Sequence, residues 1–186
     1  MRIVAGQYKG RPIQAPKTQA TRPTSDRARE SLFNMIAHAT WAPPLEGARV
    51  IDLFAGSGAL GLEALSRGAG YCLFVETASA ARGAIRNNIE ALNLFGMTRI
   101  HRRSATELGS LPTGSAEQFD IAFLDPPYHQ GLVEPCLASL KAGNWLSDNA
   151  LVVVETAADE DPVLTDWTVV SERESGAAKF WFLTRP

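Results

Sequence analysis

The chain has 186 residues, of which 45% are hydrophobic, 20% charged and 8% aromatic. This length suits one catalytic domain with a short extension, and this composition excludes disordered, collagenous and coiled-coil proteins. No apolar run approaches the roughly 20 residues of a membrane span, and the first residues lack the apolar stretch of a secretory signal, so we expect a cytoplasmic protein without a membrane partner. The two cysteines, Cys72 and Cys136, are too few for a disulfide framework or a cysteine-rich zinc site.

The charges are unevenly divided along the chain. Residues 1–46 hold seven Lys or Arg against three acidic residues, a net charge of +4, and the remaining residues therefore carry −6. Because basic side chains displace counterions from phosphates, a basic segment on an acidic body indicates a bound polyanion. A charged surface that only faces solvent is the alternative.

The first predicted elements are a short β-hairpin and a helix. Polar and apolar residues alternate on both sides of a glycine-bounded turn at residues 6–10, which is typical of a hairpin. Apolar residues then recur at helical spacing over residues 28–36, with Thr24 or Ser25 as the N-cap. Two prolines after Trp41 end this segment and predict a linker.

The linker predicts a domain boundary. Residues 1–46 are predicted to form a basic extension, and residues 47–186 a catalytic domain. We expect the hairpin to stand beside an independent domain and to contact RNA. The alternative is that Ile3, Val4 and Ile13 cover the sheet or the first helix and join the extension to the core.

After Arg49, short apolar runs alternate with longer amphipathic ones. Strands are predicted over residues 50–54, 71–75, 98–102, 121–124 and 151–155, and helices over residues 60–66, 79–94 and 132–142. This alternation predicts an α/β fold with a mostly parallel sheet. Two more β-rich runs, at residues 167–173 and 179–184, predict an antiparallel hairpin at the sheet edge, which makes seven strands in total.

The most informative stretch, residues 50–61, reads V-I-D-L-F-A-G-S-G-A-L-G, a strand that runs into a glycine-rich turn and then a helix. Its glycines fit GxGxxG, a pattern that several nucleotide-binding folds share. Glu76 closes the next strand, 20 residues after Gly56, where a carboxylate can accept hydrogen bonds from both hydroxyls of a ribose. Leu62 and Glu63 exclude a P-loop, which needs Lys followed by Ser or Thr.

Asp52 separates two classes of cofactor. A carboxylate at the head of the glycine turn would repel the pyrophosphate of a nicotinamide cofactor. S-adenosylmethionine has no phosphate, and its methionine end carries an ammonium that Asp52 and backbone carbonyls can hold. We therefore predict S-adenosylmethionine as the cofactor. The structural alternative is an Asp52 that only caps its own turn.

The strand at residues 121–124 ends in D-P-P-Y, Asp125 to Tyr128. Two prolines stiffen this loop outside the carboxyl end of the strand, where open α/β sheets bind ligands. The Asp125 carboxylate and the Pro126 carbonyl are acceptors that suit an amino group with two N–H donors, and Tyr128 offers its ring to a planar base. The predicted target is an NH2 group on a ring, and an ordinary turn after a buried strand is the alternative.

These two motifs together resemble the class I S-adenosylmethionine-dependent methyltransferases that modify exocyclic or amide nitrogens with a [DNS]-P-P-[YFW] loop. M-R-I-V-A-G-Q-Y-K-G at residues 1–10 and R-P-T-S-D-R-A-R-E-S-L-F-N-M-I at residues 22–36 narrow the resemblance to the bacterial 16S ribosomal RNA guanine-N2 methyltransferases of the RsmD type. Matches continue through D-L-F-A-G-S-G-A-L-G-L-E-A-L-S-R-G-A at residues 52–69, the D-P-P-Y loop and W-L-S-D-N-A-L-V-V-V-E at residues 145–155.

The resemblance implies a Rossmann-like methyltransferase sheet, S-adenosylmethionine as the donor, and methylation of one guanine amino group near the peptidyl site of 16S ribosomal RNA. Naked RNA and RNA within a small-subunit particle are both open as the substrate. The implied catalytic residues, which contact the guanine, are Asp125, Pro126 and Tyr128. The implied cofactor-binding residues are Asp52, Phe54, Gly56, Gly58, Glu76, Ser104, Ala105 and Asp125. The RNA-binding residues predicted from the basic segment are Lys9, Arg11, Lys17, Arg22 and Arg27.

One implied contact departs from the common pattern. After the third strand, where this fold commonly has Asp or Asn near the adenine, the chain has Ser104 and Ala105. Either the Ser104 side chain or the Ala105 backbone would take that place.

Three rival functions are open. They are an N-methyltransferase for another RNA, for DNA or for protein glutamine, a non-catalytic RNA-binding protein with a relic cofactor fold, and a nicotinamide oxidoreductase. The basic segment disfavours protein glutamine, and an intact set of Asp52, Glu76 and Asp125 disfavours a relic. The three histidines lack metal-ligand spacing, so we expect no metal site.

Overall fold

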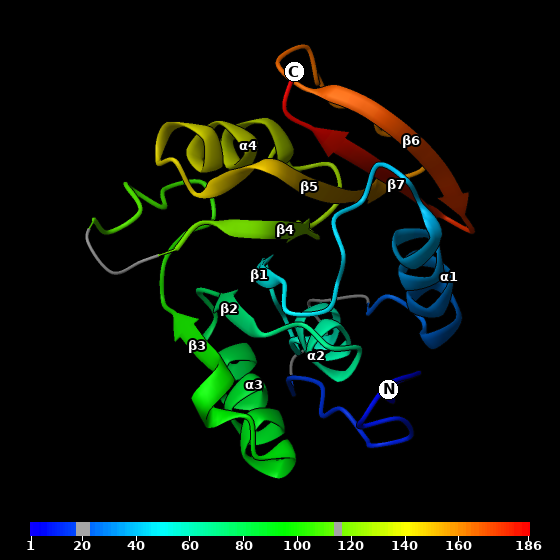
Figure 1. Ribbon diagram of the computed structural model, residues 1–186, viewed down its shortest axis with the longest axis vertical. Coiled ribbons are helices and arrows are strands. Elements are labelled where there is room, and N and C mark those ends of the chain that lie inside the picture. The colour runs from blue at the N-terminus through cyan, green and yellow to red at the C-terminus, as the bar shows by residue number, and fades with distance from the viewer. Residues whose placement is uncertain (18–22, 114–116) are drawn as a thin grey trace.

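The computed structural model describes residues 1–17, 23–113 and 117–186 (Figure 1). Its strands form one seven-stranded sheet in the order β3-β2-β1-β4-β5-β7-β6. The strands are β1 (Arg49–Leu53), β2 (Tyr71–Val75), β3 (Thr98–His101), β4 (Phe119–Leu124), β5 (Leu146–Ala157), β6 (Thr168–Ser175) and β7 (Ala178–Thr184). The helices are α1 (Asp26–His38), α2 (Ala59–Ser66), α3 (Ser79–Leu92), α4 (Val133–Ala142) and the short 3-10 helix η1 (Phe95–Met97).

The predicted fold class is confirmed. Strands β3, β2, β1, β4 and β5 pair in parallel, and β7 and β6 continue the sheet as an antiparallel hairpin at its edge. The last parallel strand is longer than the predicted 151–155, because Leu146 already pairs with Phe119 before a bulge shifts the register. Within the described ranges, no helix is long and apolar enough to span a bilayer.

Both faces of the sheet are covered. Side chains of α1, α2 and α3 form one hydrophobic cluster with one face of the strands, and side chains of α4 form a second cluster with the opposite face. Coverage on both sides explains why β1, β4 and the second half of β5 are almost continuously buried.

The N-terminal hairpin is part of the hydrophobic core. It has one isolated bridge, between Arg2 and Pro12, in place of a longer ladder. Ile3 and Ile13 are buried in the same cluster as α1 and α2. The expected hairpin beside an independent domain is therefore wrong. The structure adopts the alternative, in which Ile3 and Ile13 join the hairpin to the core.

Polar contacts also join the hairpin to α2. The backbone N–H groups of Val4 and Ala5 donate to the two carboxylate oxygens of Glu63, at 2.9 and 3.1 Å. Glu63 is fully buried and also lies 3.6 Å from Nε of Arg29 and 2.9 Å from Nε of Arg67. Removal of the hairpin would leave a buried carboxylate without two of its donors.

Arg29 is one of the seven basic residues in the N-terminal segment, yet it is fully buried. Its Nη2 lies 2.8 Å from Oδ1 of Asp26 and also donates to the backbone carbonyl of Arg2. This arginine is therefore an internal ion-pair partner and is not available to a polyanion.

Candidate active site

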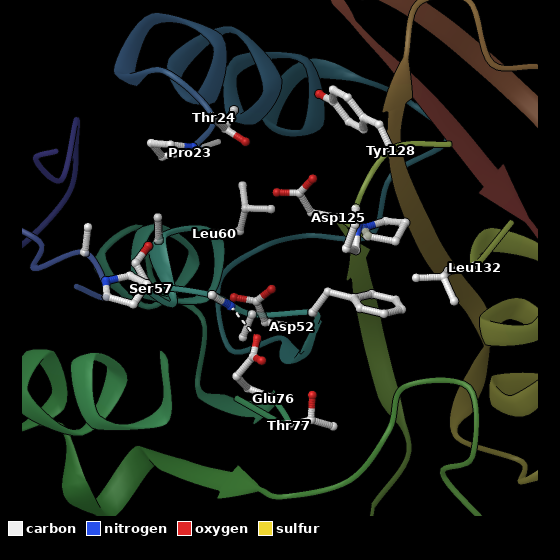
Figure 2. A pocket seen from close by; sticks show the side chains of 18 of the residues that line it. Pro23, Thr24, Asp52, Ser57, Leu60, Glu76, Thr77, Asp125, Tyr128 and Leu132 are labelled. Carbon is white, nitrogen blue, oxygen red and sulfur yellow. Dashed lines mark hydrogen bonds between the residues drawn. The ribbon is translucent and has the colours of Figure 1, made fainter. Parts of the chain in front are cut away.

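A pocket of about 610 Å³ opens at the carboxyl ends of β1 and β4, where the strand order reverses direction (Figure 2). Ligands of open α/β sheets bind at such a switch point. The lining includes most of the residues that the sequence selected, namely Asp52, Phe54, Gly56, Glu76, Ser104, Asp125, Pro126 and Tyr128. Gly58 and Ala105 are not part of it.

Asp52 lies near the carboxyl end of β1 and is almost fully buried. Its Oδ2 accepts a hydrogen bond from the backbone N–H of Gly61, 3.0 Å away in the first turn of α2. Burial raises the pKa of Asp52 to about 8, and the negative charge of Glu76 adds to the rise, whereas the Gly61 bond opposes it. Asp52 thus accepts from the first turn of α2, whose N-cap is Gly58, and the same side chain also lines the pocket.

This capping bond argues against a dinucleotide cofactor. Dinucleotide-binding folds place the pyrophosphate at the N-terminus of the helix after the glycine turn. In this protein the Asp52 carboxylate already accepts a hydrogen bond from that helix end. A pyrophosphate would therefore lack that N–H and would meet a like charge wherever Asp52 is ionised.

The glycines determine the shape of the turn between β1 and α2. Gly56 and Gly58 have φ angles of 58° and 80°, and Phe54 has a φ of 57°, which is uncommon for a residue with a side chain. A Cβ at Gly58 would meet Phe74 at 3.1 Å and Ile85 at 3.3 Å. Gly58 therefore lets the turn pack closely against Phe74 and Ile85 outside the pocket, whereas Gly56 lines the pocket.

Glu76 follows β2 and is oriented by two backbone donors. Its Oε2 accepts from the N–H of Gly56 at 2.9 Å, drawn as a dashed line in Figure 2, and its Oε1 accepts from the N–H of Ala78 at 2.9 Å. Each carboxylate oxygen has a further lone pair. The two bonds therefore hold the group in place and leave it able to accept from a ligand.

Asp125 follows β4 and lies in the middle of the pocket in Figure 2. Burial raises the pKa of Asp125 well above its usual range. The negative charges of Glu155 and Asp52 and a hydrogen bond with the Glu155 side chain raise it further. Beside Asp125 in the D-P-P-Y loop, Pro126 is buried and Pro127 is exposed.

Tyr128 is held by a residue that the sequence analysis did not select. Its hydroxyl donates to Oε1 of Glu155 at 2.7 Å, and the hydroxyl of Thr24 donates to Oε2 of the same carboxylate at 2.8 Å. Ser25 is the N-cap of α1, where its side chain accepts from the N–H of Ala28. Thr24 is therefore free of the capping role proposed for it and lines the pocket.

The four carboxylates come from four neighbouring strands. Glu76, Asp52, Asp125 and Glu155 lie at the carboxyl ends of β2, β1, β4 and β5, in the order of the sheet. Asp52 pairs in register with Phe74 and Phe123, which belong to the α1–α3 cluster, and side chains alternate along a strand. All four therefore point to that face. The described lining contains no lysine or arginine.

The remaining predicted residues lie around this centre. Ser104 lines the pocket with its Oγ 2.8 Å from Oγ1 of Thr106, and Ala105 is buried, so the choice between them for the adenine stays a prediction. Among the candidate RNA contacts, Arg22 lies outside the described residues, and the four exposed ones are Lys9, Arg11, Lys17 and Arg27.

The N-terminal segment contributes pocket residues that sequence reasoning missed. They are Met1, Ala15, Pro16, Pro23 and Thr24. These residue types carry no chemical signature, and only the packing of the hairpin against α2 and α3 brings them to the pocket. The backbone N–H of Gln14, for example, donates to Oδ1 of Asn88 in α3 at 2.8 Å.

Known proteins resemble the chain over both of its predicted parts. A family model described as Conserved hypothetical protein 95 matches residues 1–184. Curated proteins named Ribosomal RNA small subunit methyltransferase D, from Haemophilus influenzae and Escherichia coli strain K12, are 34% and 35% identical, each over 97% of this chain and over 91% and 87% of their own lengths. The solved structure of the Escherichia coli protein yhhF has a TM-score of 0.81 and 34% identity, and the match covers 100% of this chain and 97% of that one. The chain therefore belongs to the family of the ribosomal RNA small subunit methyltransferases D.

Proposed function

We propose that this protein transfers a methyl group from S-adenosylmethionine to the exocyclic N2 of a guanine in small-subunit ribosomal RNA. One observation carries the proposal: the D-P-P-Y loop meets an acidic pocket at the switch point of the sheet, and the described part of its lining has no lysine or arginine. The name of the relatives supports ribosomal RNA as the substrate.

The charges of the pocket fit the cofactor. S-adenosylmethionine carries an ammonium and a sulfonium and has no phosphate, which suits a lining that contains Asp52 and Glu76. Asp52 would hold the ammonium, and Glu76 the ribose hydroxyls. Ser104 or the Ala105 backbone would lie at the adenine. When bound, the cofactor supplies an electrophilic methyl group whose leaving group is a neutral thioether.

The D-P-P-Y loop would hold the guanine. Its N2 is a weak nucleophile because the lone pair is delocalised into the ring. The Asp125 carboxylate and the Pro126 carbonyl would each accept a hydrogen bond from one N–H of this amino group and so orient its nitrogen, while Tyr128 stacks on the base. Positioning of this kind can lower a barrier by about 7 to 11 kcal/mol in favourable cases. A cation in the pocket favours ionised Asp125, which could then accept the proton that the nitrogen loses.

The distribution of charge supports a polyanionic substrate. Residues 78–105 hold five arginines against the single acidic Glu90, a net charge of +4, whereas residues 106–186 carry −9. This second basic stretch adjoins the N-terminal hairpin, because Nη2 of Arg11 donates to the carbonyl of Ala91 in α3 at 2.8 Å. Both would contact RNA phosphates beside the pocket, and a paired guanine would have to be flipped out to enter it.

The test is methylation of small-subunit particles that lack the modification. Particles from a strain without this enzyme are incubated with the purified protein and labelled S-adenosylmethionine, and the modified base is mapped by mass spectrometry. We expect one N2-methylguanine. Asp125→Ala should abolish transfer and leave cofactor affinity within a few fold. A label on another base, or an equal loss of transfer and cofactor affinity, would contradict the proposal.

A further inference from the structure

Glu155 links three parts of the site. It lies near the carboxyl end of β5 with 5% of its surface exposed. Its two oxygens accept hydrogen bonds from the hydroxyls of Tyr128, in the D-P-P-Y loop, and Thr24, in the segment before α1. Figure 2 shows Thr24 and Tyr128 at the top of the pocket and Asp125 below them, near its centre.

Glu155 also lies beside Asp125. Leu124 of β4 pairs in parallel register with Val154 of β5, so the next residue on each strand is Asp125 and Glu155. The hydrogen bond between these two side chains, and the charge of Glu155, are among the causes that raise the pKa of Asp125, after burial itself. The titratable groups that face Asp125 are Glu155 from β5, Asp52 from β1 and Tyr128 from its own loop.

We propose that Glu155 is a positioning residue of the base-binding site, which holds the Tyr128 ring and the Asp125 carboxyl in a fixed relation to each other. The inference rests on the proposed function, because it requires Asp125 and Tyr128 to contact the base. It also gives the N-terminal segment a place in the site, since the Thr24 hydroxyl shares the carboxylate that holds Tyr128.

The chemistry of the contacts requires a carboxylate. A carboxylate accepts through both oxygens, so it can take a hydroxyl on each and still share a proton with Asp125. A glutamine has one acceptor oxygen, and its NH2 group would face one of the two hydroxyl oxygens. Glu155→Gln is therefore nearly isosteric, removes one acceptor and removes the negative charge beside Asp125.

The experiment compares Glu155→Gln with Glu160→Gln. Glu160 is the matched control, because it is also a carboxylate that accepts two hydrogen bonds, but from the backbone N–H groups of His129 at 2.8 Å and Ala157 at 2.7 Å in place of two hydroxyls. The first readout needs no activity: the titration of Asp125 in the ligand-free protein, followed by carbon-13 NMR of its carboxyl. The second is the single-turnover rate of guanine methylation as a function of pH, with cofactor affinity measured alongside.

For Glu155→Gln we expect a downward shift of the Asp125 midpoint by about 1 pH unit or more, because a like charge is removed. The acid limb of the rate profile should move to lower pH with it, and the maximal rate should fall by about tenfold or more. Cofactor affinity should stay within about threefold of wild type. Glu160→Gln should leave the Asp125 midpoint and the acid limb in place.

Tyr128→Phe is a second variant that tests the same contact if Glu155→Gln does not fold. It keeps the ring and removes the hydroxyl, so the rate should fall by about threefold to tenfold with cofactor affinity unchanged. An unmoved Asp125 midpoint in Glu155→Gln, or full rates in both variants, would reduce Glu155 to a structural role and overturn the inference. If the wild-type protein methylates no guanine, the proposed function fails instead, and the Asp125 titration still reports on Glu155.

Discussion

Asp52→Asn should stabilise the ligand-free protein while weakening its cofactor site. Asp52 has a pKa of about 8 in the folded protein, against an ordinary value of 3.8. Between these values the folded state binds a proton that the unfolded state has lost, so stability falls as pH rises. Each pH unit in this interval costs about 1.4 kcal/mol, which amounts to roughly 4 kcal/mol at pH 7. An asparagine cannot ionise, and its oxygen can still accept the Gly61 N–H.

The expected gain in the free energy of unfolding is therefore up to about 4 kcal/mol at pH 7, smaller at pH 5, and constant above pH 8. Urea unfolding of both proteins across this range measures it, and calorimetry measures the affinity for S-adenosylmethionine, which should fall by about tenfold or more. Asp120→Asn is the matched control. Asp120 lies on the same sheet and accepts from Arg49 N at 2.9 Å and Ser147 Oγ at 3.2 Å, outside the pocket.

The control should lose stability by an amount that does not change between pH 6 and 8. If Asp52→Asn destabilises the protein, or if its effect does not depend on pH, Asp52 is an ordinary ionised cap and the reasoning about its burial is wrong. If Asp52→Asn binds S-adenosylmethionine as tightly as the wild-type protein does, the ammonium of the cofactor does not contact Asp52.

Three further outcomes are expected. Glu76→Ala should weaken S-adenosylmethionine by about 1.5 to 3 kcal/mol in calorimetry, the range for a hydrogen bond to a charged group, and unchanged affinity would refute its ribose contact. Deletion of residues 1–13 should lower the thermal midpoint and cofactor affinity together, because burial of Ile3 and Ile13 contributes about 1.5 to 3 kcal/mol each; a truncated protein with both values intact would show an independent hairpin. Lys9→Ala and Lys17→Ala should each reduce the magnitude of the slope of log affinity for RNA against log salt concentration by roughly 0.7 to 0.9. Lys141→Ala on α4 should leave this slope unchanged. Equal slopes in all three variants would show that the N-terminal segment does not contact RNA.

Hydrophobic periodicity was sufficient to predict the sheet. Buried parallel strands read as continuous apolar runs, so β1, β2 and β4 were found to within two residues. The first half of β5 was missed because Ser147, Asp148 and Asn149 are polar, and only pairing with β4 makes that part a strand. The division of the chain at residue 46 stays a prediction, since the proline linker gives no information about whether the two sides pack together.

Two buried charges show what composition cannot reveal. A count of charges treats Arg29 as a surface cation, yet it shares one helical face with Leu32, Phe33 and Ile36, and that spacing was the available signal that it points inward. Glu155 follows three valines at the end of a buried strand. Asp52 and Asp125 were selected because each is a carboxylate at the end of a buried strand. The same criterion, applied to every strand, would have found Glu155.

The arrangement of the four carboxylates explains why this pocket should select a cation. Glu76, Asp52, Asp125 and Glu155 come from adjacent strands and share one face, and the first three line the pocket. The charge of Glu76 raises the free energy of ionised Asp52, and the charges of Asp52 and Glu155 raise that of ionised Asp125. In the ligand-free protein, bound protons relieve that repulsion, as the raised pKa values of Asp52 and Asp125 indicate. A ligand with positive charge can replace those protons, whereas a phosphate would add to the repulsion. The repulsion that raises these pKa values is therefore the feature by which the pocket would favour the proposed cofactor, S-adenosylmethionine, over a dinucleotide.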